Sequence, residues 1–256
     1  MKLIFDSYSC SMPATLRHPE LDILRTIAIL LMVLYHLLFD LSFFYHADID
    51  IYHGAWKIMG TVAALLFLML VGISFTVSWK RTISQKQSWR AAYPKYAARG
   101  FFLLSWGLLI SFITAIATPD EYIRFGILHL IGTATLLLPF FARLRYWNFI
   151  IGLWMVGCGT LFTFIRGESP FLLPFGIMYR SFTTLDYYPL FPWMGVILLG
   201  MCMGYLLYEQ YPAPVSKASS PLLSAISWPG KHALAIYLIH QPILIVLLYV
   251  IQPLVS

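Results

Sequence analysis

Hydrophobic residues along this chain occur in long continuous runs rather than in the alternating or amphipathic patterns of a soluble fold. A helix needs about 20 apolar residues to cross the hydrocarbon layer of a bilayer. Seven runs approach that length, and short polar connections separate them. They cover residues 24–45, 56–79, 100–118, 126–141, 147–165, 190–208 and 233–251. The pattern predicts an all-α, polytopic transmembrane helix bundle of about seven spans.

The composition supports the same interpretation. Of the 256 residues, 60% are hydrophobic and 17% aromatic, and only 11% are charged, against roughly 25% charged in an ordinary globular domain. So few charges would leave the surface of a soluble globule uncovered, and a disordered chain needs high charge and low hydrophobicity. We expect one membrane domain over residues 1–256, with a cytoplasmic segment over residues 1–20 and the bundle over residues 21–251.

The net charge of +6, from 17 basic and 11 acidic residues, informs orientation rather than nucleic-acid binding. The basic residues form no stripe, so we expect no nucleic-acid partner. Most of them fall in connections on one side of the membrane if the N-terminus is cytoplasmic, as the positive-inside rule requires. The first 20 residues lack the apolar core of a cleavable signal peptide. We expect a multi-pass protein of the inner cell membrane, and oligomer formation stays open.

The cysteines and short motifs predict no metal site and no nucleotide loop. Cys10, Cys158 and Cys202 are odd in number and have no metal-ligand spacing, so we expect them to be packing residues. No histidine pair has zinc-site spacing. Neither a Walker loop nor a dinucleotide glycine fingerprint is present, which argues against ATP-driven transport and NAD chemistry.

Ionisable residues in the first apolar run are the first candidates for function, since each costs about 3 kcal/mol at the centre of a span. At about 100° per residue, Asp22, Arg25, His36 and Asp40 fall within roughly 60° of one helical face. A carboxylate one turn away orients an imidazole and raises its basicity. The spacing indicates that Asp40 orients His36 as a general base. The alternative is that the two side chains only join helices.

Other candidates lie on both sides of the predicted membrane. Histidines follow an acidic loop or lie within later spans, and aromatic residues accompany a carboxylate in an outer connection: His53, Trp56, His129, Asp186, Trp193 and His240. The histidines are candidate catalytic residues, and Asp186, Trp56 and Trp193 suit a sugar-like substrate, although interfacial aromatic belts are equally rich in tryptophan. Arg25, Arg99, Arg143 and Lys231 lie on the cytoplasmic side. They suit the phosphates of a cytosolic donor, although topology alone also predicts basic residues there.

Several segments, in this order, resemble the heparan-alpha-glucosaminide N-acetyltransferase catalytic-domain family, including its compact bacterial members. They are residues 21–28 with His36 and Asp40, and residues 66–74, 125–132, 186–193 and 236–242. The resemblance implies an enzyme that transfers an acetyl or acyl group from cytoplasmic acyl-CoA to an amine or hydroxyl of an extracytoplasmic glycan or amino sugar. By position, His53 matches the catalytic histidine of the family, and His36 matches a polar site in the first helix. Thr26 replaces the glycine that usually follows the arginine.

These residues leave the mechanism and the class of function open. Direct attack on the thioester and a covalent acyl-histidine relay fit these residues equally well, with His53 or His36 as the base and His129 or His240 polarising the carbonyl. The alternative function is a proton-coupled transporter or lipid-binding membrane protein that uses the same polar residues.

Overall fold

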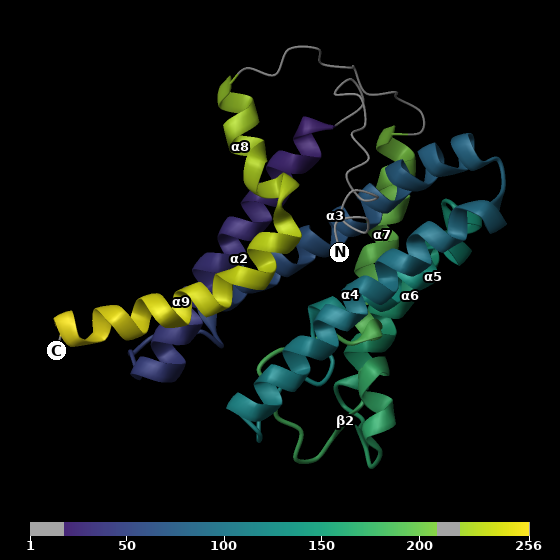
Figure 1. Ribbon diagram of the computed structural model, residues 1–256. Helices are drawn as coiled ribbons and strands as arrows, with labels where there is room; N and C mark the ends of the chain where they lie inside the picture. The colour runs from purple at the N-terminus through teal and green to yellow at the C-terminus, as the bar shows by residue number, and fades with distance from the viewer. Residues whose placement is uncertain (1–17, 209–220, 256) are drawn as a thin grey trace. The chain divides into compact units, whose positions relative to one another are not determined.

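A computed structural model describes residues 18–208 and 221–255 (Figure 1). Almost all of the regular structure is helical, as predicted. The α-helices are α2 (Pro19–Tyr45), α3 (Gly54–Lys86), α4 (Trp89–Ala117), α5 (Ile127–Phe141), α6 (Trp147–Phe162), α7 (Leu190–Tyr208), α8 (Pro221–Lys231) and α9 (Ala233–Val255). The short elements are η2 (Ala142–Leu144), β1 (Arg166–Gly167), η3 (Pro170–Phe175) and β2 (Met178–Tyr179). Residues 1–17, including Cys10 and most of the expected cytoplasmic segment, lie outside the described residues.

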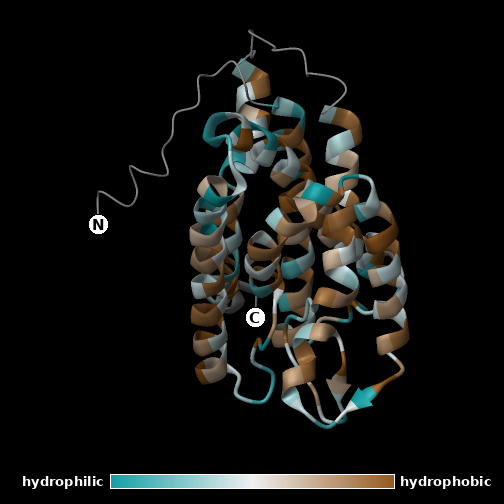
Figure 2. Cartoon of the chain, turned by 90° about the vertical axis from the view of Figure 1, so that its right-hand side faces the viewer, coloured by the Kyte–Doolittle hydropathy of each residue, from teal (hydrophilic) through white to brown (hydrophobic). Residues whose placement is uncertain are grey.

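The number of spans agrees with the expected bundle. Within the described residues, six helices are long and apolar enough to cross a membrane. The remaining predicted span, the fifth at residues 147–165, corresponds to α6, which has 16 residues and is therefore about 24 Å long. In Figure 2 the middles of the helices are mostly hydrophobic, and hydrophilic residues gather at the helix ends and in the connections. The protein is an all-α, multi-pass membrane bundle.

Helix boundaries differ from the apolar runs because hydropathy marks the membrane and not the end of a helix. α3 continues to Lys86 and α4 begins at Trp89, so both extend beyond their runs into basic sequence. The Ser88 hydroxyl caps α4 by accepting a hydrogen bond from the backbone N–H of Ala91. The short helix α8 was not expected, since its 11 residues are too few for a span.

The chain forms two compact units. Of the described residues, the first unit contains residues 18–67 and 221–255, with α2, the start of α3, α8 and α9. The second contains residues 68–208, with the remainder of α3 and α4 to α7. The expectation of one functional membrane domain stays a prediction.

In the first unit, α2 packs against both α8 and α9 (Figure 1). The Thr26 hydroxyl donates to the backbone carbonyl of Ile226 at 2.9 Å and accepts from the backbone N–H of Gly230 at 2.9 Å. A Cβ on Gly230 would lie 1.8 Å from the carbonyl oxygen of Asp22. The backbones of α2 and α8 therefore touch, and Thr26 joins them.

In the second unit, α4 packs on α5, α6 packs on α7, and α3 crosses α7 at glycines. A Cβ on Gly72 would lie 2.0 Å from the carbonyl oxygen of Ile197, and a Cβ on Gly200 would lie 2.2 Å from that of Met69. Small residues allow this close approach of backbones in membrane helices. The Thr76 hydroxyl reinforces the crossing with a hydrogen bond to the carbonyl of Met201 at 3.2 Å.

Candidate functional site

A carboxylate–imidazole pair lies just before α3. His53 Nδ1 is 3.0 and 3.1 Å from the two carboxylate oxygens of Asp50. Asp50 Oδ1 also accepts the backbone N–H of Tyr52 at 3.1 Å, which fixes the carboxylate by a local turn. An ionised carboxylate only accepts, so Nδ1 is the donor, and the neutral ring keeps the lone pair of Nε2 free. The pair has the arrangement of an oriented general base.

This pair is open to solution. The side chain of His53 is 79% exposed and that of Asp50 is 64% exposed. Both line a surface hollow of about 420 Å³, together with Trp56 and the residues around them: Asp48, Ile49, Gly54 and Ala55. The structure thus brings together two of the predicted site residues, His53 and Trp56. Asp50 was not among them, although its position three residues before His53 is the signal that identifies it.

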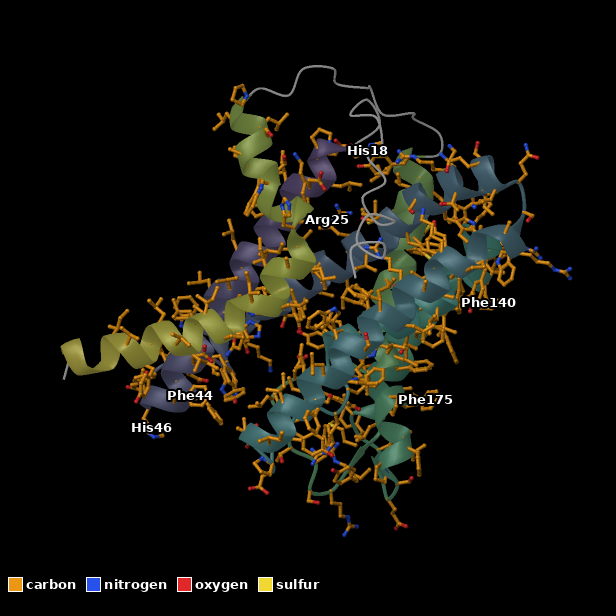
Figure 3. The ribbon with its side chains drawn as sticks, in the orientation of Figure 1. His18, Arg25, Phe44, His46, Phe140 and Phe175 are labelled. Carbon is orange, nitrogen blue, oxygen red and sulfur yellow. The ribbon has the colours of Figure 1, made fainter. Side chains whose placement is uncertain are left out.

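The connection that carries the pair is tied back to α2. Ser42 donates to the carbonyl of Ile49 at 3.1 Å, and the backbone N–H of Ala47 donates to the carbonyl of Leu41 at 3.1 Å. Ile51 is buried, with 2% of its surface exposed, and so anchors the connection. Figure 3 labels Arg25 near one end of α2 and His46 just beyond the other end, where this connection begins.

A second polar group lies between α2 and α9 in the same unit. The rings of His36 and His240 are 4.9 Å apart and nearly perpendicular. One turn further along α2, Asp40 Oδ1 accepts a hydrogen bond of 2.6 Å from Gln241 Nε2. Asp40 is fully buried. We call these four residues the α2–α9 cluster.

The hydrogen bonds of the α2–α9 cluster differ from the expected pairing, in which Asp40 orients His36 as a general base. His36 Nδ1 bonds to the carbonyl of Met32 at 2.9 Å, within its own helix, and the described contacts of Asp40 lead to Gln241 and not to His36. The helix geometry explains this, because a side chain at i+4 competes with the backbone carbonyl at i−4 for the ring. Gln241 was missed because its partner lies 201 residues away in the sequence.

In the second unit, His129 and Asp186 both bind the start of α5. The backbone N–H of Ile127 donates to Asp186 Oδ2 at 3.0 Å, and that of Gly126 donates to His129 Nδ1 at 3.3 Å. Since Nδ1 accepts, the proton of the neutral ring is on Nε2, which lies 3.4 Å from the Ser111 hydroxyl. Both ring nitrogens are therefore engaged. These contacts favour a structural role for His129, and its predicted role at a carbonyl stays a prediction.

Asp186 gives this helix start a dependence on pH. Burial raises the pKa of Asp186 from 3.8 to about 6, although the N–H of Ile127 acts in the opposite direction. Between these two values the folded protein holds a proton that the unfolded chain has lost, so stability falls as the pH rises through this window. We expect the unfolding temperature of the wild type, relative to Asp186→Asn, to fall between about pH 4 and about pH 6.

Thermal unfolding of both proteins in detergent over this pH range tests the expectation. Asparagine keeps an oxygen that can accept from Ile127 but has no proton to exchange. Parallel curves for the two proteins would contradict the assignment, because the dependence would then come from other groups.

The aromatic connection before α7 belongs to the same unit. The Trp193 and Tyr188 rings lie 4.9 Å apart, and Arg124 stacks on the Tyr122 ring at 4.1 Å while donating to the carbonyl of Thr183 at 2.6 Å. Asp186 lies in this connection, with its carboxylate on the start of α5, and Trp193 lies in the first turn of α7. Their predicted role in substrate binding is untested by these contacts.

The four basic candidates divide between the units. Arg25 forms an ion pair of 2.6 Å with Asp22, with 26% of the arginine side chain exposed. Lys231 is exposed and follows Gly230, which packs on Asp22. Arg25 and Lys231 therefore lie at the same end of the first unit. Arg99 on α4 and Arg143 in η2 are exposed in the second unit. The described residues contain no group of three or more His, Cys, Asp or Glu side chains placed to hold a metal ion.

Comparison with known proteins identifies the family. The family model described as heparan-alpha-glucosaminide N-acetyltransferase, catalytic, matches residues 17–242, which is most of the chain. No curated protein and no solved structure matches the chain. The matched region contains the Asp50–His53 pair and the α2–α9 cluster. The chain therefore belongs to the heparan-alpha-glucosaminide N-acetyltransferase catalytic family, and it is a multi-pass membrane protein of acetyltransferase type.

Proposed function

We propose that this protein transfers an acetyl or other acyl group from cytoplasmic acyl-CoA to an amine or hydroxyl of an extracytoplasmic glycan or amino sugar. Family membership supplies the class of reaction. The observation that carries the proposal is the exposed Asp50–His53 pair, whose Nδ1 is bonded and whose Nε2 is available as a base. His36 is the alternative base, since its Nδ1 is likewise bonded, to the carbonyl of Met32.

In the proposed reaction, His53 Nε2 takes a proton from the acceptor amine or hydroxyl as the nucleophile attacks the thioester carbon. The carbon–sulfur bond then breaks, and the CoA thiolate leaves and is protonated. Asp50 keeps the ring in one orientation and stabilises the imidazolium that forms. Trp56 lines the same hollow and is our candidate for stacking on a sugar ring. In the second unit, Asp186 and Trp193 are separate candidates for acceptor binding.

The donor would bind through its phosphates. Arg25 and Lys231, both in the first unit, are one pair of basic side chains we propose for this role, and Arg99 and Arg143, both in the second unit, are a separate pair. Arginine suits phosphate because its guanidinium donates two parallel hydrogen bonds. The Asp22–Arg25 ion pair holds the guanidinium in place while part of it stays exposed.

Asp50→Asn should lower turnover roughly 10- to 100-fold, because the ring loses its ionic partner and a misplaced catalytic group costs up to about 100-fold. Asp48→Asn is the matched control, since Asp48 lines the same hollow and makes no described contact with the ring. Steady-state rates of acyl transfer check both variants. Equal turnover of Asp50→Asn and the wild type would remove Asp50 from the mechanism.

Binding of the donor tests the class of reaction. The purified protein should bind acetyl-CoA saturably and hydrolyse it slowly without an acceptor, and amino sugars or envelope glycans should accelerate release of CoA. Isothermal titration and a thiol assay measure the two steps. Absence of both binding and hydrolysis would favour the transporter or lipid-binding alternative.

A further inference from the structure

The α2–α9 cluster has an excess of hydrogen-bond acceptors. Among the described residues, three buried side-chain atoms of the cluster find no hydrogen-bond partner: Asp40 Oδ2, His240 Nε2 and Gln241 Oε1. His240 Nδ1 lies 2.7 Å from the carbonyl of Tyr237, so the neutral ring carries its proton there and Nε2 accepts. His36 has the same tautomer, with Nδ1 on Met32. Each free atom of the cluster is therefore an acceptor.

Asp40 has no cation to balance it among the described residues. Its carboxylate accepts only from Gln241 and forms no described ion pair. Arg25 is paired with Asp22 and lies about 22 Å away along α2. α9 contains no lysine or arginine. A fully buried carboxylate with one hydrogen bond is costly, by several kcal/mol, unless it is neutralised.

We propose that the α2–α9 cluster is a proton-binding site, with the bound proton carried on Asp40. One proton removes the buried negative charge and also turns an unpaired acceptor into a donor for a neighbouring acceptor. The described residues place no three His, Cys, Asp or Glu side chains so that they could hold a metal ion together, and a proton needs only one of these acceptors. Chains of aspartate and histidine within membrane spans commonly conduct or store protons.

This proton site goes beyond the proposed function and does not depend on it. Its link to acyl transfer is that the reaction both releases and takes up a proton. An attacking amine releases a proton and the leaving CoA thiolate takes one up. The rings of His36 and His240 are in contact, and His240 Nε2 has no partner among the described residues, so the two rings offer a route for a proton to the carboxyl group of Asp40.

Infrared spectroscopy of the full-length protein tests the site without donor or acceptor. At about pH 7.5 the wild type should show the C=O stretching band of a protonated carboxyl group, and Asp40→Asn should lose it. Gln241→Leu should keep the band at a higher frequency, because the carboxyl group loses its hydrogen bond. Asp48→Asn, an exposed acidic residue in the connection after α2, should leave the band unchanged.

The outcomes are decisive in either direction. Loss of a carboxylate band in Asp40→Asn, with the protonated-carboxyl region unchanged, would overturn the proposal. Asp186→Asn assigns any contribution from the carboxyl group of Asp186. If Asp40→Asn does not fold, Gln241→Leu decides: a shifted band supports the proton site, and an unchanged spectrum overturns it. Neither result changes the test of acyl transfer, which uses donor binding and product formation.

Discussion

Replacing His53 with alanine lowers the turnover of acyl transfer by about 10²- to 10⁴-fold, the usual contribution of a general base. The protein should stay folded and bind acyl-CoA, because His53 is exposed and its described hydrogen bonds lead only to Asp50. The loss should therefore appear in kcat and not in the affinity for the donor. Initial rates with purified protein, over a range of acyl-CoA concentrations, separate the two quantities.

His46→Asn is the matched control for this experiment. His46 is an exposed histidine in the same connection, and it has a left-handed backbone (φ 52°) that asparagine tolerates. It should retain the activity of the wild type. Full turnover of His53→Ala would show that another group removes the proton, and His36→Ala would then be the variant to measure.

Replacing Gly72 with alanine destabilises the second unit by about 3 kcal/mol, at the upper end for an overpacked core. The added Cβ would lie 2.0 Å from the carbonyl oxygen of Ile197 and 2.7 Å from the backbone nitrogen of Met201. Backbone atoms in a helix cannot rotate away as a side chain can. The crossing of α3 and α7 must therefore open, and the Thr76–Met201 hydrogen bond at 3.2 Å is lost with it.

Gly157→Ala provides the control, since a Cβ there meets nothing within 4 Å on α6. It should be neutral or slightly stabilising, because alanine favours a helix by up to about 1 kcal/mol over glycine. Thermal unfolding and the yield of monodisperse protein in detergent compare the two variants. Equal stability of Gly72→Ala and the wild type would contradict the close crossing.

Hydropathy predicted the class of fold because the bilayer imposes it directly on the sequence. The apolar runs located every long helix, and the resemblance across the chain agrees with the family match over residues 17–242. Helix ends were less predictable, since α3 and α4 extend through basic residues that hydropathy assigns to connections. α8 was missed because its packing depends on a contact between Gly230 and Asp22, which local sequence does not reveal.

The candidate site was predictable where chemistry is local. Asp50 and His53 are three residues apart, and one acidic connection brings them together. The partner of Asp40 was not predictable, because helical periodicity indicates a shared face with His36 but cannot show that Gln241 of α9 approaches it. Thr26 illustrates the same limit: its hydroxyl looked like a departure from the family pattern, yet it joins α2 to α8.

Acyl transfer across a membrane by the purified protein tests most directly whether the protein is an acyltransferase with His53 as its base. The protein is reconstituted into vesicles, with labelled acetyl-CoA on the side of the basic helix ends and an amino sugar on the side of His53. We expect labelled acetyl product on the acceptor side for the wild type, and product lower by about 10²-fold or more for His53→Ala. Absence of acylated product from the wild type with every amine and hydroxyl acceptor tried, or equal product from both proteins, would contradict it.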